Sequence, residues 1–190
     1  MTSTPLLIVL SGPSGVGKDS VISRMLQTRR NYHVAITATS RPPRPKEQDG
    51  IDYIFLSTNT FREMIERNEF LEWAIVHGNY YGVPNTQVIK PLDEGKDVIV
   101  KPDVQGAASI KKLNPNAILI FLSPPSLEEL SKRLHSRMTE SQDEIQNRLQ
   151  TAEKEMIEST KFDHIIINHH DRLNDTVDKI QSILDKERHT

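Results

Sequence analysis

A glycine-rich segment that follows a short apolar run is the feature that most constrains this chain. Leu6–Leu10 are all apolar, and residues 11–20 read SGPSGVGKDS, in which Gly12, Gly17 and Lys18 have the spacing of a phosphate-binding loop. Glycines let backbone N–H groups converge on one point, the next helix directs its positive dipole end there, and the lysine adds a cation. The segment predicts a site for a nucleoside triphosphate, contacted by Gly12, Pro13, Ser14, Gly15, Val16, Gly17, Lys18, Asp19 and Ser20.

The position after the lysine departs from the usual loop. A phosphate-binding loop normally has Ser or Thr there, and its hydroxyl binds magnesium. This chain has Asp19, followed by Ser20. Either Ser20 supplies the hydroxyl one position later, or Asp19 acts on the metal. A carboxylate beside a triphosphate requires a cation between them, so Asp19 strengthens the expectation of magnesium.

Length and composition narrow the class of protein. The 190 residues suffice for one α/β domain with small inserted units, and the net charge of −2 gives no general attraction to nucleic acid or membranes. No cysteine is present, which excludes disulfides and thiolate metal sites and fits a reducing compartment. The chain also lacks a signal peptide pattern and a run long enough to span a bilayer. We expect a soluble cytoplasmic protein with no nucleic-acid or membrane partner, as a monomer or small homo-oligomer.

Apolar runs alternate with helical patterns along most of the chain. The predicted strands are Leu6–Leu10, Val34–Ile36, Asp97–Val100, Ala117–Leu122 and His164–Ile167. The predicted helices are Lys18–Arg30, Val104–Lys112, Ser126–His135, Ser141–Ser159 and Arg172–Lys186. This alternation predicts an α/β fold in which helices cover both faces of a parallel sheet.

Two stretches interrupt the alternation, residues 37–84 and residues 123–161. Both follow predicted strands, at the edge where open α/β sheets bind their ligands, and flaps at that edge can close over phosphates. We therefore expect the first stretch to be a substrate-binding insertion and the second to be a lid. The phosphate-loop core is then formed by residues 1–36, 85–122 and 162–190.

The insertion carries two arginines among prolines. Prolines stiffen the backbone around Arg41 and Arg44, and paired guanidinium groups match phosphate oxygens. Tyr53 lies in a hairpin-like segment, Ile51–Leu56, and offers a phenolic O–H to the same phosphate. An exposed basic loop beside a buried tyrosine explains these residues equally well.

Carboxylates and lid arginines complete the candidate groups. Glu72 lies between apolar residues and needs a donor, such as the N1–H and amino group of guanine; a structural salt bridge is the alternative. Asp103 follows a predicted strand and either faces the phosphates or caps a helix. Arginines of the second stretch either neutralise a transferred phosphoryl group or form ion pairs on a solvated helix. These arginines are Arg133, Arg137 and Arg148.

Taken together, these residues resemble the guanylate kinase family over nearly the whole chain. The resemblance rests on SGPSGVGK, TSRPPRPKEQDGIDYIF, NEFLEWAIVHGNYYG, DVQGA and KRLHSR with NRL after it. It implies a phosphate-loop core with a GMP-binding insertion and a lid. It also implies the reaction of ATP with GMP to give ADP and GDP, with magnesium, in purine nucleotide metabolism.

The resemblance also implies roles for individual residues. Thr37 would lie near the guanine O6, and Glu72 and Asp103 would receive the guanine N–H donors. The GMP phosphate would be held by Arg41, Arg44, Tyr53 and Tyr81. Arg133 and Asn168 would lie on the ATP side, Asn168 near the adenine. The residues implied as catalytic are Lys18, Arg41, Arg137 and Arg148.

Four positions depart from the family pattern. Asp19 replaces a small or hydroxyl residue, Val83 a Ser or Thr, Lys101 an acidic residue and Met138 a lid glycine. The GKDS sequence also resembles the loop of bacterial ribose 1,5-bisphosphate phosphokinase. A related small-molecule phosphokinase is therefore one alternative, and a non-catalytic guanylate-kinase-like binding module is another.

Overall fold

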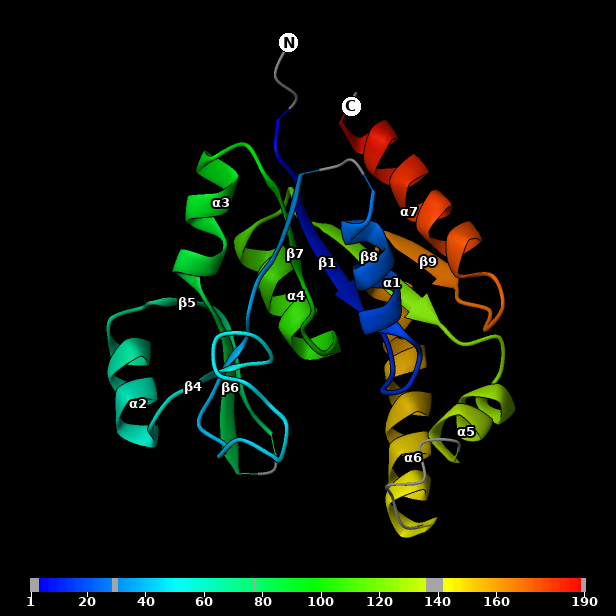
Figure 1. Ribbon diagram of the computed structural model, residues 1–190, viewed down its shortest axis with the longest axis horizontal. Helices are drawn as coiled ribbons and strands as arrows, with labels where there is room; N and C mark the ends of the chain where they lie inside the picture. Colours follow the sequence, from blue (N-terminus) through cyan, green and yellow to red (C-terminus); the bar gives the residue numbers. More distant parts are fainter. Residues whose placement is uncertain (1–3, 29–30, 77, 136–141, 189–190) are drawn as a thin grey trace.

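The larger of two sheets forms the centre of the protein (Figure 1). The computed structural model describes residues 4–28, 31–76, 78–135 and 142–188. Within them the larger sheet has five strands, paired in parallel in the spatial order β2-β7-β1-β8-β9. These strands are β1 (Leu7–Ser11), β2 (Tyr32–Val34), β7 (Asp97–Val100), β8 (Ile118–Ser123) and β9 (His164–Ile167). The parallel α/β fold that the sequence predicts is confirmed.

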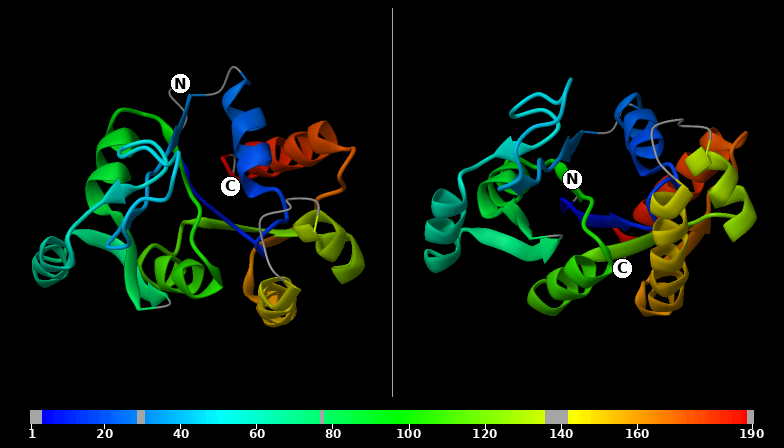
Figure 2. Two further views of the ribbon diagram at one scale, coloured as in Figure 1. Left: turned by 60° about the horizontal axis from the view of Figure 1, so that its bottom comes forward. Right: turned by 90° about the horizontal axis from the view of Figure 1, so that it is seen from below.

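Helices cover both faces of this sheet, as Figure 2 shows. On one face, α1 (Lys18–Leu26) and α7 (Leu173–Glu187) pack apolar side chains onto β1 and β8. On the other face, α4 (Val104–Leu113) and α3 (Ile89–Asp93) do the same. Alternate side chains of β1 enter opposite cores, because successive residues of a strand point to opposite faces. In the described part of the chain, no helix is long and apolar enough to cross a membrane.

Residues of the insertion form the second sheet, in the order β4-β3-β6-β5. Its strands are β3 (Ala38–Thr39), β4 (Ile54–Phe55), β5 (Phe70–Val76) and β6 (Asn79–Pro84). Helix α2 (Thr58–Glu66) covers it through Phe61, whose ring stacks on Phe70 at 4.2 Å and on Tyr80 at 5.3 Å. Aromatic stacking therefore gives this small sheet an apolar anchor of its own.

The second interrupting stretch forms a pair of helices beside the larger sheet (Figure 1). Helices α5 (Leu127–His135) and α6 (Gln142–Glu158) enclose a small separate core that includes Leu134 and Ile145. The N–H of Glu129 donates to Ser126 Oγ at 3.2 Å, as expected where a helix begins. A short 3₁₀ turn follows α6 at Ser159–Lys161, and another follows β6 at Asn85–Gln87.

Two predicted elements have boundaries that are wrong by more than one residue. The strand predicted at Val34–Ile36 is β2, which begins at Tyr32 because pairing with β7 begins there, at Asp97. The first helix ends at Leu26 rather than Arg30, which lies outside the described residues; the Thr28 hydroxyl donates to the Met25 carbonyl at 2.7 Å just after the helix end.

The prediction of a hairpin-like segment at Ile51–Leu56 is also wrong. Its strand, β4, pairs in parallel with β3 rather than folding back on its own neighbours. Tyr53 instead bridges to Asp49 across the turn at Gly50. The antiparallel hairpin of the insertion is formed by β5 and β6.

The phosphate loop connects β1 to α1 and is tied to the end of the sheet. Gly12 has a φ of 145°, and a Cβ there would lie 2.3 Å from the Leu122 carbonyl oxygen, so only glycine fits. Asn168, directly after β9, donates from Nδ2 to the Val16 carbonyl at 2.8 Å. Its Oδ1 accepts from the Thr176 hydroxyl at 2.9 Å. A buried amide thus holds the loop against α7.

We expect Asn168→Ala to lower the free energy of unfolding by about 2–3 kcal/mol, because it leaves the Val16 carbonyl and the Thr176 hydroxyl without these partners. Urea denaturation measures the change. Asn174→Ala is the matched control, since Asn174 accepts from Arg24 at an exposed position of α7. It should cost under about 1 kcal/mol. Equal costs for the two variants would contradict the anchoring role.

Candidate functional site

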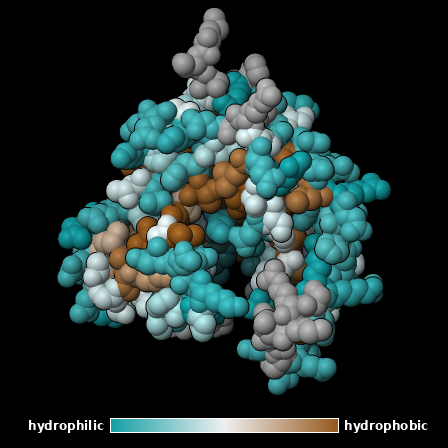
Figure 3. Space-filling model, in the orientation of Figure 1, coloured by the Kyte–Doolittle hydropathy of each residue, from teal (hydrophilic) through white to brown (hydrophobic). Residues whose placement is uncertain are grey.

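Two cavities share a wall at the carboxyl ends of β1 and β7. The first, here the acceptor cavity, has a volume of about 440 Å³ and reaches the insertion. The second, here the loop cavity, has about 310 Å³ and follows the phosphate loop. Figure 3 shows the surface hollowed between the insertion and α6. Residues that line both cavities are Ser14, Lys18, Asp19, Lys101, Pro102 and Asp103.

The loop cavity is lined by most of the predicted triphosphate contacts. They are Gly12, Pro13, Ser14, Gly15, Gly17, Lys18, Asp19 and Ser20. The ammonium of Lys18 donates to the carbonyl oxygens of Gly12 and Pro13, the latter at 3.3 Å. From α6, Arg148 donates to Ser14 Oγ at 2.7 Å. Cationic groups from α1 and α6 therefore converge on the loop.

Arg133 and Asn168 approach the loop from its outer side. Arg133 donates to the Val16 carbonyl at 3.2 Å, to the Asn168 carbonyl at 2.9 Å and to Glu129. It also lines a separate cavity of about 490 Å³ that includes His169 and Arg172. Both predicted residues thus brace Val16, and neither lines the loop cavity.

Arg41 lies at the insertion end of the site. Its guanidinium makes two hydrogen bonds of 3.0 Å to the Glu47 carboxylate and one of 3.2 Å to the Tyr81 hydroxyl. These bonds raise the pKa of Arg41 above its usual value, chiefly through Glu47. Its Cζ lies 5.4 Å from the ring centre of Tyr53. Burial, the largest cause, raises the pKa of the Tyr53 hydroxyl.

Glu72 and Asp103 bring two carboxylates into the acceptor cavity. Asp103 Oδ1 accepts from the Gly106 N–H at 2.8 Å, which confirms the helix-capping interpretation. A Cβ on Gly106 would lie 2.9 Å from Glu72 Oε2, so this glycine makes room for the carboxylate. Burial, and secondarily the charge of Asp103, raise the pKa of Glu72 to about 7. A ligand that donates a hydrogen bond to the Glu72 carboxylate would therefore stabilise its ionised form.

Asp19 and Lys101 form an ion pair across the shared wall. Lys101 Nζ lies 2.7 Å from Asp19 Oδ1, which joins the first turn of α1 to the segment after β7. Asp19 and Ser20 also supply a carboxylate and a hydroxyl to the loop cavity. Within the described residues, no group of three or more His, Cys, Asp or Glu side chains could hold a metal. Magnesium needs only one or two protein oxygens beside phosphates and water, so this donor pair fits it.

The structure brings most of the predicted substrate residues together. Those that line the acceptor cavity are Thr37, Tyr53, Glu72, Tyr81 and Asp103. Arg44 is exposed and lines neither cavity. Its backbone is paired with Glu47: the Arg44 N–H donates to the Glu47 carboxylate at 2.7 Å, and the Arg44 carbonyl accepts from the Glu47 N–H at 3.1 Å. Arg137 and Met138 lie outside the described residues. Val83 is buried in the core below α4, so the hydroxyl-bearing residue of the family pattern has no counterpart facing the cavity.

Two site residues were missed by sequence reasoning. Glu47 holds Arg41, but the irregular proline-rich loop has no periodicity that pairs them. Glu155, on α6, lines the loop cavity, and burial raises its pKa although the charge of Lys18 lowers it. It follows the buried Ala152 by three residues, and this helical spacing could have placed Glu155 on the inward face.

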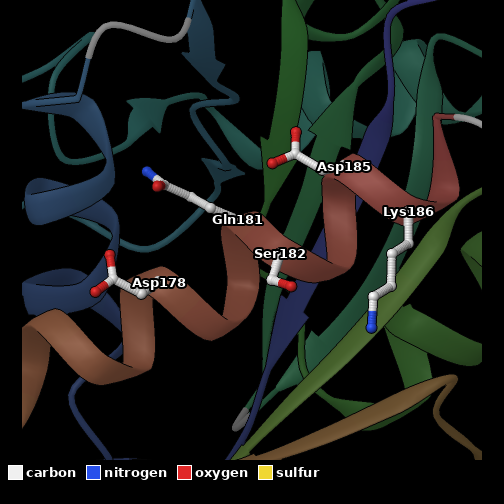
Figure 4. Close-up of a pocket in the computed structure, with 5 residues that line it drawn as sticks. All are labelled: Asp178, Gln181, Ser182, Asp185 and Lys186. Atoms are coloured by element: carbon white, nitrogen blue, oxygen red, sulfur yellow. The ribbon is translucent and has the colours of Figure 1, made fainter.

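A further groove lies along α7, away from the two cavities. Figure 4 shows its lining side chains, all of which come from α7. They are Asp178, Gln181, Ser182, Asp185 and Lys186. A groove along one helix brings together no phosphate loop, no paired arginines and none of the predicted site residues. Most of the predicted site residues therefore line the two cavities that share a wall, and none lines this groove.

Comparisons with known proteins agree with this geometry. Residues 4–187 match the family model described as guanylate kinase. A guanylate kinase of Desulfitobacterium hafniense is 45% identical over 179 residues, covering 94% of this chain and 88% of that protein. One of Gloeobacter violaceus is 45% identical over 181 residues, covering 95% and 87%. The crystal structure of a guanylate kinase from Anaplasma phagocytophilum matches with a TM-score of 0.79 at 29% identity, covering 99% and 88%.

The pKa of Glu72 predicts a pH-dependent stability. The folded chain keeps a proton at Glu72 up to about pH 7, whereas the unfolded chain releases it near 4.5, so the contribution of Glu72 to stability falls as the pH rises between these values. Glu72→Gln removes this loss. Its unfolding free energy relative to the unaltered protein should rise by about 1–3 kcal/mol between pH 4.5 and pH 8.5, measured by urea denaturation.

The exposed carboxyl of Glu66, in the same insertion, provides the control. Glu66→Gln measures the general effect of replacing an exposed glutamate by glutamine, and the change in Glu72→Gln should be clearly larger. A Glu72→Gln difference that does not change with pH would contradict the assigned pKa.

Proposed function

The chain belongs to the guanylate kinase family, and we propose that its two adjoining cavities bind ATP and GMP side by side for direct phosphoryl transfer. The protein is an ATP:GMP phosphotransferase, a nucleotide-binding kinase that converts ATP and GMP to ADP and GDP. The observation that carries the residue assignment is the shared wall, since Lys18 lines both the loop cavity and the acceptor cavity. Substrates bound in these two cavities can exchange a phosphoryl group directly, without a covalent enzyme intermediate.

The loop cavity takes ATP. Backbone N–H groups of the loop and the N-terminus of α1 bind the phosphates, and Lys18 turns from the loop carbonyls to them. Arg133 and Asn168 act on this side by holding Val16, and the 490 Å³ cavity beside Arg133 is the place assigned to the adenine. The predicted proximity of Asn168 to the adenine stays a prediction.

The acceptor cavity takes GMP. Glu72 and Asp103 accept the guanine N1–H and amino donors, and Thr37 faces O6. A base donor stabilises the ionised carboxylate of Glu72 and so opposes the effect of burial, which raises its pKa. The GMP phosphate lies against four side chains, of which Arg44 must turn inward on binding. They are Arg41, Arg44, Tyr53 and Tyr81.

The transfer is an in-line displacement at the γ-phosphorus. An oxygen of the GMP phosphate forms the new bond, the bond to the β,γ-bridging oxygen breaks, and its electron pair stays on ADP. No general base is needed because the attacking phosphate is already anionic. Arg148, which already contacts the loop at Ser14, and Arg137 neutralise the moving charge. The insertion of residues 37–84 and the lid of residues 123–161 close to exclude water.

Magnesium is the cofactor in this proposal, held by Asp19 and Ser20. When bound, the ion would offset phosphate charge and align the oxygens. A role in purine nucleotide metabolism is part of the proposal because the proposed substrates and products are purine nucleotides. A cytoplasmic setting is also proposed, and the lack of cysteine in the sequence fits a reducing compartment. A monomer or small homo-oligomer stays a prediction.

A substrate panel tests the assignment. ADP release should be rapid with GMP and at background with AMP, UMP and ribose 1,5-bisphosphate, because only guanine presents adjacent N–H donors to Glu72 and Asp103. A coupled ADP assay measures all four. Activity confined to the sugar phosphate would overturn the assignment in favour of a related phosphokinase. Failure to bind ATP in a thermal-shift titration would favour a binding module.

Lys18 should be essential for turnover. We expect Lys18→Ala to lower kcat by about 10²–10³-fold, since it removes a cation from the developing charge. Circular dichroism should show an unchanged fold, because Lys18 belongs to none of the apolar cores. Lys179→Ala, at an exposed position of α7, is the control and should keep full activity. Unchanged turnover in Lys18→Ala would refute the role of Lys18.

A further inference from the structure

We propose that Lys101 is an additional phosphate-binding residue, whose ammonium contacts the phosphoryl group as it passes between the cavities while Asp19 holds it in place. This inference rests on the function proposed above. Lys101 directly follows β7, and it lines both the acceptor cavity and the loop cavity. A cation placed there lies where the donor and the acceptor phosphates meet.

The ion pair with Asp19 positions this cation. Lys101 Nζ lies 2.7 Å from Asp19 Oδ1, and that bond uses one of its three donors. The ammonium can therefore keep Asp19 while it donates to a phosphate oxygen. Its charge also acts on the acceptor side, where it lowers the pKa of Tyr53 against the larger effect of burial.

Charge balance at the shared wall favours the same role. Among the residues common to both cavities, Asp19 and Asp103 are anionic, and Lys18 and Lys101 are cationic. Two polyanionic substrates that meet beside two carboxylates require compensating cations. Without Lys101, Lys18 would be the one cation among these shared residues, against two carboxylates.

A purely structural role explains the pair less well. The Asp19 side chain is 82% exposed and that of Lys101 is 34% exposed, so the pair is largely in contact with solvent. Exposed ion pairs contribute little to stability, because water screens them and ordering two side chains costs entropy. The position of the pair on the wall, rather than its strength, is the feature that needs a function.

Lys101→Met tests the inference with a probe that spans both cavities, adenosine and guanosine joined through five phosphates. Titration calorimetry gives its Kd, and ADP and GMP are titrated separately. We expect the Kd of the probe to rise about 10–100-fold, with ADP and GMP changed by less than about threefold. Turnover should fall mainly in kcat rather than in KM. Lys101→Arg, which keeps the charge, should retain most of the affinity.

The control is Lys96→Met. Lys96 forms an ion pair with Glu94 at the same 2.7 Å distance, its side chain is about as exposed as that of Lys101, and it lines neither cavity. It should leave the probe affinity unchanged. Unchanged probe affinity in a folded Lys101→Met, whether or not its melting temperature falls, would overturn the inference alone. If the unaltered protein did not bind the probe, the proposed function would fail as well.

Discussion

The hydrogen bonds that tie the Val16 carbonyl to the rest of the molecule hold the phosphate loop in its working shape. Asn168, from the end of β9, donates to this oxygen at 2.8 Å, and Arg133, from α5, donates at 3.2 Å. Elements far apart in sequence thereby meet at one backbone atom. The direction of α1, the place of Lys18 and the wall between the cavities all follow from that anchoring.

The charged groups near this anchor differ in how well the folded protein stabilises them. The Glu72 carboxylate is buried near Asp103, which raises its pKa to about 7 and lowers stability when it ionises. The guanidinium of Arg41, by contrast, is paired with the Glu47 carboxylate, which holds it in one orientation. In the proposed function, the ionised carboxylate that lowers stability is the group that would accept the base donors, and the oriented guanidinium is one that would bind the phosphate.

The sequence predicted the fold well where short-range rules act. Strands β7 and β9 have the predicted bounds, because each is a short run of three apolar residues after a polar one. Strand β7 is buried along its whole length, as expected of a central parallel strand, whereas β9 lies at the sheet edge with Ile165 and Ile167 exposed. The prediction was wrong for strands whose bounds or direction depend on the strand they pair with. Tyr32 belongs to β2 because it lies opposite Asp97, and β4 pairs in parallel with β3 although its sequence suggests a hairpin. Neither partner can be read from local composition.

The sequence by itself determined the phosphate loop, the parallel sheet and the types of residue at the site, because spacing, periodicity and charge are local properties of the chain. The tertiary structure alone decided which of those residues meet. It turned Val83 into the core, gave Glu47 to Arg41 and set Lys101 against Asp19 across 82 residues of sequence. Contacts of that kind depend on how strands are ordered and helices packed, which is a property of the whole fold.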